Sequence, residues 1–114
     1  MSIVRKLSQI EETPHPFLAD VGMRTLYSKK GDDGDATCFV IRCSVGAEIE
    51  EHIHPEENDI IYVLKGKATM WVEDRGSFNL EPGVFVVVPK RLRHRTYDVV
   101  EELLIYDVFT PPMF

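Results

Sequence analysis

Residues 46–66 of this chain read G-A-E-I-E-E-H-I-H-P-E-E-N-D-I-I-Y-V-L-K-G. His52 and His54 are two positions apart, so in an extended segment their imidazoles project from the same face. A short connection leads to Asp59, which keeps the inward parity of the strand-like apolar run that follows it. The stretch therefore predicts two imidazoles and one carboxylate directed at one point beside a β-strand.

A third histidine, His94, could be brought to the same point by a turn of the chain. His94 follows V-P-K-R-L-R, a turn between two further strand-like runs. Imidazole and carboxylate ligands together suit iron, manganese, nickel, cobalt, copper or zinc, and such sets often leave coordination positions open. Taken separately, the acids could form a solvated loop and His94 could belong to a basic surface with its neighbouring arginines. Their joint placement instead predicts one divalent transition metal held by His52, His54, Asp59 and His94.

The chain has the pattern of short strands separated by turns. From residue 22 onward, apolar and β-branched runs alternate with turn signals, and no stretch keeps the i, i+3, i+4, i+7 spacing of an amphipathic helix. Glycines mark breaks such as K-G-K at 65–67 and K-G-D-D-G-D at 30–35. The pattern predicts an all-β barrel or sandwich. The predicted strands cover residues 23–28, 36–45, 48–53, 60–65, 68–73, 77–80, 84–88, 95–100 and 103–109.

The two ends of the chain have weaker patterns. Residues 2–12 fit either a short helix or an edge strand, whereas T-P-H-P-F at 13–17 must be extended because proline disfavours helix at and before its own position. His15, between those prolines, is expected to be a solvated loop residue. Met113 and Phe114 follow two prolines, and this apolar end is either exposed, tucked away or docked on a partner subunit.

Composition and charge exclude several classes of protein. A chain of 114 residues suits one domain, and a hydrophobic content of 44% excludes a disordered chain. The formal net charge is −6, which disfavours nucleic-acid binding and favours a small-molecule partner. No stretch resembles a signal peptide or approaches the roughly 20 apolar residues of a membrane span. We therefore expect a cytoplasmic protein with no membrane partner.

The two cysteines, Cys38 and Cys43, lie in one strand-like run. Their odd separation puts them on opposite faces, about 16 Å apart at roughly 3.3 Å per residue, which exceeds the span of a disulfide. We expect free thiols that serve as small packing residues in a reducing compartment.

The two histidine-bearing runs together resemble the motifs of the cupin superfamily. The first motif is a glycine, five residues, H-x-H, three or four residues, an acid, six residues and a glycine; every interval is met by Gly46, His52, His54, Asp59 and Gly66. The second is a glycine, five residues, P-x-G, two residues, a histidine, three residues and an asparagine; its positions here are Gly83, Pro89, His94 and Asp98. Arg91 stands in place of the second glycine and Asp98 in place of the asparagine.

The resemblance implies a fold and an organisation. Residues 1–114 would form one small single-domain cupin of the conserved-barrel type, with the first motif at 46–66 and the second at 83–98. The fold would be the cupin double-stranded β-helix, a jelly-roll-like barrel. A metal would be held by the two histidines, the acid and the later histidine, and the protein would frequently be a homodimer.

The acid of the first motif departs from the family's usual glutamate. Asp59 is one methylene shorter, so either its backbone lies nearer the metal or this ligand is weak or absent. Asn58 and Glu57 are less suitable substitutes, because Asp59 alone keeps the six-residue interval to Gly66.

Strand parity predicts which side chains face the interior. Thr96 and Asp98 share the parity of His94 and are candidates to support it or to meet a ligand. The apolar positions of inward parity would either line a cavity or pack a plain core; they are Phe39, Ile41, Cys43, Ile61 and Val63.

Members of the superfamily carry out dioxygenation, isomerisation, decarboxylation and lyase reactions. The resemblance therefore implies a metal-dependent enzyme that acts on a small polar or anionic molecule, in a reaction that the fold does not select. A non-catalytic cupin that binds or senses a small molecule stays open, because few titratable groups besides the ligands have inward parity. A purely structural dimeric barrel is a third alternative.

Overall fold

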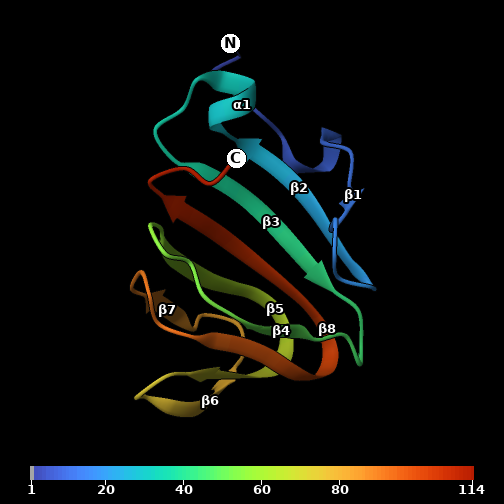
Figure 1. Cartoon of the computed structure of the whole chain (residues 1–114). Coiled ribbons are helices and arrows are strands. Elements are labelled where there is room, and N and C mark those ends of the chain that lie inside the picture. The colour runs from blue at the N-terminus through green and yellow to red at the C-terminus, as the bar shows by residue number, and fades with distance from the viewer. Residues whose placement is uncertain (1) are drawn as a thin grey trace.

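Two long strands, β5 (Asn58–Val72) and β8 (His94–Thr110), pair with each other along the barrel (Figure 1). This computed structural model describes residues 2–114. The other elements are η1 (Leu7–Gln9), β1 (Thr13–Pro14), β2 (Val21–Tyr27), α1 (Lys29–Asp32), β3 (Thr37–Cys43), β4 (Ile49–His52), β6 (Gly76–Leu80) and β7 (Phe85–Val88). Antiparallel pairing runs β1-β2-β3-β8-β5-β6, while β4 pairs with β8 and β7 with β5. The predicted all-β, jelly-roll-like architecture is confirmed.

The chain does not turn at Gly66, where K-G-K predicts a break. The two strands predicted at 60–65 and 68–73 are one strand, β5, with register shifts against β8 around Gly66. Gly66 has φ +97°, and a Cβ there would lie 2.1 Å from the carbonyl oxygen of Glu102 on β8. The glycine therefore allows close approach of two strands rather than a turn. The strands predicted at 95–100 and 103–109 are likewise the single strand β8.

Alternation along the strands directs one set of side chains into the barrel. In β3, Phe39, Ile41 and Cys43 are buried, whereas Cys38 is half-buried. Both cysteines are free, as predicted, and burial raises the pKa of the Cys43 thiol to about 11. Burial also confirms the inward parity of Ile61 and Val63. The rest of the apolar core includes Val21, Met70, Val72, Leu80, Leu103, Ile105 and Phe109.

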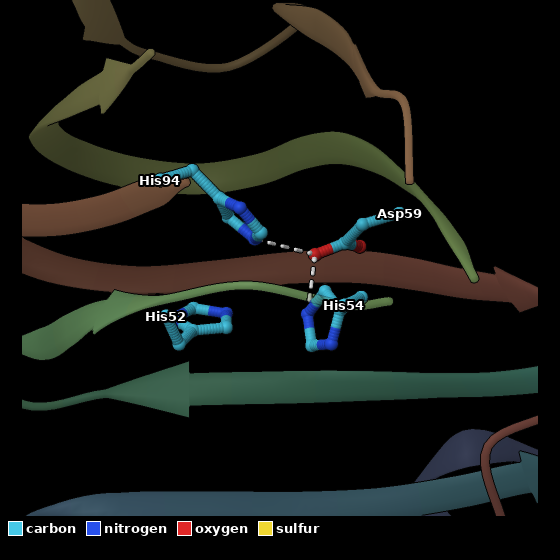
Figure 2. A group of neighbouring side chains, drawn as sticks. All are labelled: His52, His54, Asp59 and His94. Carbon is cyan, nitrogen blue, oxygen red and sulfur yellow. Dashed lines mark ion pairs between the residues drawn. The ribbon is translucent and has the colours of Figure 1, made fainter. Parts of the chain in front are cut away.

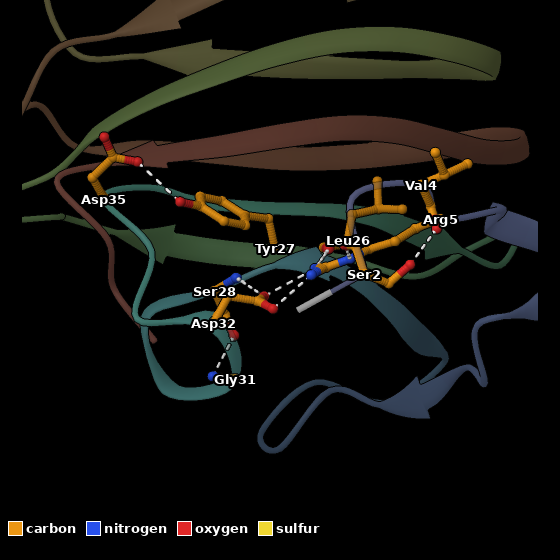
Figure 3. Close-up of polar contacts among 9 residues, drawn as sticks. All are labelled: Ser2, Val4, Arg5, Leu26, Tyr27, Ser28, Gly31, Asp32 and Asp35. Atoms are coloured by element: carbon orange, nitrogen blue, oxygen red, sulfur yellow. Dashed lines mark hydrogen bonds and ion pairs between the residues drawn. The ribbon is translucent and has the colours of Figure 1, made fainter.

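The N-terminal segment is fastened through Arg5 (Figure 3). Its guanidinium donates hydrogen bonds to both carboxylate oxygens of Asp32, at 2.9 and 2.6 Å, and to the carbonyl oxygen of Leu26. Residues 2–12 contain one short 3-10 helix, η1, and no strand, so the edge-strand alternative is wrong and the helical one holds only for residues 7–9. Side-chain anchoring has replaced regular backbone pairing here.

One helical turn, α1, occupies the predicted turn at residues 30–35. The Ser28 hydroxyl accepts a hydrogen bond from the Gly31 amide at 3.0 Å, and Asp33 ends the turn with φ +52°. No helix within residues 2–114 is long and apolar enough to cross a membrane.

The apolar C-terminal residues fold back onto the chain's own barrel. The carbonyl oxygen of Phe114 accepts hydrogen bonds from the Thr37 hydroxyl at 2.8 Å and from the Lys29 amide at 2.9 Å. The Phe114 ring lies 5.6 Å from that of Phe39, measured between centroids. Of the alternatives for this end, the tucked one holds for Phe114, whereas Met113 remains 40% exposed.

Candidate metal centre

Three strands and one connection bring together all four predicted side chains (Figure 2). His52 ends β4, Asp59 is the second residue of β5, and His94 begins β8, where it is the cross-strand partner of His52. One ligand atom from each of these residues and from His54 lies within 4.8 Å of the others. Two ligand atoms on opposite sides of one ion would be about 4.2 Å apart. The group could therefore hold a metal with little rearrangement.

His54 reaches the group from a connection rather than from a strand. The sequence predicts an extended segment through H-x-H, with the strand itself at 48–53; in the structure β4 ends at His52 and His54 lies between β4 and β5. The Arg91 amide donates a hydrogen bond to the His54 carbonyl oxygen at 2.8 Å. The turn before β8 thus holds the connection that carries His54.

Arg91 adopts a backbone conformation that favours glycine, with φ +74°. Glycine is the residue that the second motif has at this position, so the local geometry of the motif survives without it. Asp98, at the motif's asparagine position, also has a positive φ of 51°, which aspartate tolerates better than arginine does.

The Arg91→Gly variant is expected to be more stable than the parent protein by about 0.5 to 1 kcal/mol, because it relieves this strain. Urea unfolding measures the difference. Lys90→Gly is the matched control, since Lys90 has no positive φ, and it should be neutral or destabilising. A destabilised Arg91→Gly variant would contradict the strain at this position.

Backbone carbonyls orient two of the imidazoles. Nδ1 of His52 lies 2.7 Å from the Glu50 carbonyl oxygen, and Nδ1 of His94 lies 3.0 Å from that of Leu92. A carbonyl oxygen only accepts hydrogen bonds, so Nδ1 donates in both histidines and, in the neutral imidazole, Nε2 keeps a free lone pair. This arrangement is typical of histidines that bind a metal through Nε2.

Several buried polar atoms of this group lack a hydrogen-bond partner within the described chain. They include Nε2 of His54, Nε2 of His94 and Oδ1 of Asp59. Oδ2 of Asp59 lies 3.4 Å from Nε2 of His94 and 3.7 Å from Nε2 of His54, so aspartate reaches the imidazoles despite its shorter side chain (Figure 2). Each unsatisfied buried group costs about 1 to 3 kcal/mol. Buried imidazole nitrogens and carboxylate oxygens that lack hydrogen-bond partners fit the binding of a divalent transition ion.

A second carboxyl group, Asp107, lies beside Asp59. Burial and the negative charge of Asp59 hold the pKa of Asp107 well above its ordinary value. Burial also pushes the pKa of Asp59 upward, but the proximity of Asp107 and His94 outweighs it and leaves that pKa below its ordinary value. Asp107 is therefore the protonated member of the pair, and it supports the carboxylate form of Asp59.

Burial favours the neutral form of two imidazoles, those of His52 and His54. It lowers the pKa of His54 to about 4, against a partly compensating attraction from Asp59, and it also lowers the pKa of His52. Neutral imidazole is the form that binds metals, so these two side chains are ready to bind at neutral pH.

Metal-free protein is expected to lose stability as the pH falls from about 6.5 towards 4. The unfolded chain binds a proton at His54 near pH 6.5, whereas the folded chain does so only near 4. Because the unfolded state then holds more protons, the loss reaches about 2 to 3 kcal/mol for this residue. Urea unfolding in the presence of a chelator measures it, and a His54→Gln variant should lose less. Parallel pH curves for the two proteins would contradict this origin.

The four side chains lie in the wall of a cavity of about 910 Å³. Apolar side chains from several strands form most of the remaining wall, among them Phe39, Ile41 and Ile61, whose inward parity the sequence predicts. Thr96 is buried and lines the cavity, but Asp98 is exposed and is absent from its wall. The expectation for Asp98 is wrong because its positive φ breaks the alternation of β8 and turns Val99 inward instead.

His15 also lines the cavity, contrary to the expectation of a solvated loop residue. The pairing of β1 with β2 carries the following segment to the cavity, and the His15 amide donates to the Val21 carbonyl oxygen at 2.9 Å. No local pattern around H-P-F predicts this position, because strand pairing over a distance creates it. Asp107 was also missed, although its parity with Ile105 and Phe109 is a signal that could have found it.

Fold and site together define a known class of protein. The family described as the cupin domain matches residues 39–109, which is more than half of the chain. The chain therefore belongs to the cupin family.

Individual proteins are similar to this chain at low sequence identity. Glucose-6-phosphate isomerase from Pyrococcus furiosus is 28% identical over 116 residues, which cover 94% of this chain and 61% of that protein. A predicted oxalate decarboxylase from Thermotoga maritima has a TM-score of 0.83 at 18% identity, covering 96% of this chain and 99% of that one. An RmlC-like cupin from Shewanella frigidimarina has a TM-score of 0.83 at 19% identity, covering 99% and 94%. At such identities the two solved structures show the fold alone.

Proposed function

We propose that this chain is a single-domain, metal-dependent cupin enzyme. One divalent transition ion would be held by His52, His54, Asp59 and His94, and a small organic molecule would enter the cavity beside it. The observation that carries the proposal is the convergence of four ligand side chains, several with unsatisfied lone pairs, in the wall of a large cavity. An ordinary packed core would contain neither unsatisfied lone pairs on buried side chains nor a large cavity beside them.

The metal, when bound, would supply Lewis acidity, an activated water or a platform for oxygen chemistry. The chain's own residues have separate tasks in this proposal. Carbonyl oxygens of Glu50 and Leu92 hold two imidazoles in their binding tautomer, and Asp107 keeps Asp59 ionised while facing the cavity. Asp107 also provides a titratable group beyond the ligands, which favours an enzyme over a non-catalytic binding module.

The reaction type is proposed only as a class. Two relatives have the names of an isomerase and of a predicted decarboxylase, and dioxygenase and lyase chemistry would use the same kind of site. The test is a thermal-shift screen of metabolites on metal-loaded protein, followed by product analysis of each hit. Chemical conversion of a hit supports the enzyme, whereas hits that are bound and never converted point to a sensory or binding cupin.

We also propose that the protein is a homodimer, formed through the outer faces of β5, β7 and β8. Uncharged side chains face outward there in two cross-strand rows, and Phe85 and Val87 remain 60% and 51% exposed. An uncharged face of this kind complements a second copy of itself about a twofold axis, with no like charges brought together. The two rows are Tyr106–Tyr62–Phe85 and Val108–Ile60–Val87.

A Phe85→Asp variant should therefore run as a monomer in light scattering at a concentration where the parent protein is a dimer. Burying one unpaired charge in each copy costs several kcal/mol and would lower the association constant by about 100-fold or more. Val100→Asp is the control, because Val100 is 65% exposed elsewhere on β8. A monomeric parent protein at tens of micromolar would overturn the proposal.

We propose further that the protein is located in the cytosol. Two free cysteines in one strand are compatible with a reducing compartment.

A further inference from the structure

Beyond the candidate metal centre, the cavity wall is predominantly apolar. Ile41, Met70 and Phe109 contribute side chains from β3, β5 and β8, and Met23 contributes one from β2. The volume of about 910 Å³ exceeds what a dicarboxylate or a triose would fill. Such a wall stabilises apolar surface, at about 25 cal/mol for each Å² that a ligand buries.

Among residues 2–114, every formally charged residue lining the cavity, apart from its histidines, is acidic. Glu50, Glu51 and Glu57 lie around the segment that carries the H-x-H pair, and Asp59 and Asp107 lie inside. No lysine or arginine of the described part of the chain lines it. An anionic ligand would approach these carboxylates and would find no cationic side chain to pair with.

The arginines of the adjoining strands do not fill this gap. Arg24 and Arg42, on β2 and β3, pair with Glu12, at 3.8 Å and 2.8 Å. Both side chains are therefore engaged at another part of the surface, and neither lines the cavity.

His15 offers the cavity a neutral hydrogen-bond donor rather than a charge. Its Nδ1 accepts hydrogen bonds from the Phe17 and Leu18 amides, at 3.1 and 3.2 Å. An imidazole whose Nδ1 accepts carries its hydrogen on Nε2, and burial lowers the pKa of His15, which favours this neutral form.

We infer that the cavity takes a neutral, mainly apolar organic molecule, such as a substituted aromatic compound, rather than an anion. This class differs from the polar or anionic molecule that the sequence favours, and from the anions in the names of two relatives. That the ligand presents an oxygen atom to the metal rests on the proposed function. Its neutral and apolar character rests on the cavity wall alone.

A matched pair of fluorescent probes tests the inference on metal-free protein. N-Phenyl-1-naphthylamine is neutral, and 8-anilinonaphthalene-1-sulfonate is the same skeleton with one sulfonate added. The neutral probe should bind saturably and at least about tenfold more tightly than the anion, since an unpaired buried charge costs more than 1.4 kcal/mol. Equal or tighter binding of the sulfonate, or no binding of the neutral probe, would overturn the inference.

Two variants locate the probes. Thr25 lines the cavity from β2, so Thr25→Lys should tighten binding of the sulfonate by about tenfold by supplying a cation. Val100→Ser, at an exposed position of β8 outside the cavity, should leave both affinities unchanged. If the folded Thr25→Lys protein binds the sulfonate with unchanged affinity, the probes bind elsewhere and the inference is refuted. If Thr25→Lys does not fold, Met23→Lys is used in its place. Because chelator is present throughout, failure here is distinct from failure of the metal proposal, which metal titration decides.

Discussion

Replacing His94 with alanine is expected to abolish stoichiometric metal binding. Nε2 of His94 is buried, has no hydrogen-bond partner within the described chain and lies 3.4 Å from Asp59 Oδ2. Loss of a ligand should cost more than the roughly 10- to 100-fold in affinity that supporting residues of metal sites supply. We therefore expect a fall of about 100-fold or more, measured by metal analysis of purified protein and by titration of metal-free protein. His52→Ala should behave alike.

The control for this experiment is His15→Ala. His15 lines the same cavity but does not belong to the group whose ligand atoms converge. Its loss should leave metal stoichiometry unchanged. Full metal occupancy in both the His52→Ala and the His94→Ala proteins would refute the proposed metal-dependent function. His94→Gln, which retains more of the side-chain volume, separates loss of a ligand from loss of folding.

The largest loss of stability is expected from Gly66→Ala. An added Cβ would lie 2.1 Å from the Glu102 carbonyl oxygen, a backbone atom, so β5 and β8 would have to separate. The left-handed φ of +97° adds strain for any residue with a side chain. Together these effects should cost about 4 kcal/mol or more in the free energy of unfolding, which is exceptional for a single methyl group.

Gly76→Ala is its matched control. Gly76 has a similar φ of +84°, but nothing lies within 4 Å of its added Cβ. It should cost only the conformational strain, about 1 kcal/mol. Urea unfolding of both variants separates the two effects, and equal losses would show that close approach of the strands at Gly66 is unimportant.

The same glycine shows what sequence reasoning could predict about the fold. Alternating apolar runs located most of the strand residues, because one buried face leaves a period of two in the sequence. Glycine alone could not distinguish a turn from a close strand contact, since both need a residue without a side chain. Which one occurs depends on Glu102, a residue distant in the sequence.

Sequence reasoning likewise predicted some residues of the candidate site and missed others. His52, His54, Asp59 and His94 could be grouped because spacing and strand parity constrain them, and because two motifs resemble those of cupins. Parity failed at Asp98, where a left-handed residue interrupts the alternation. His15 could not be found at all, because the pairing of β1 with β2 places it.

The placement of His94 at the start of β8 has a consequence for the order of assembly. β8 pairs with β3, β4 and β5, segments far from it in the sequence, so its docking requires closure of long chain loops. Barrels with such distant pairings typically fold over milliseconds to seconds. No partly folded chain that lacks β8 can present all four side chains at once. Acquisition of the ion should therefore follow barrel closure, and the rate of metal uptake by refolding protein would report the last step of folding.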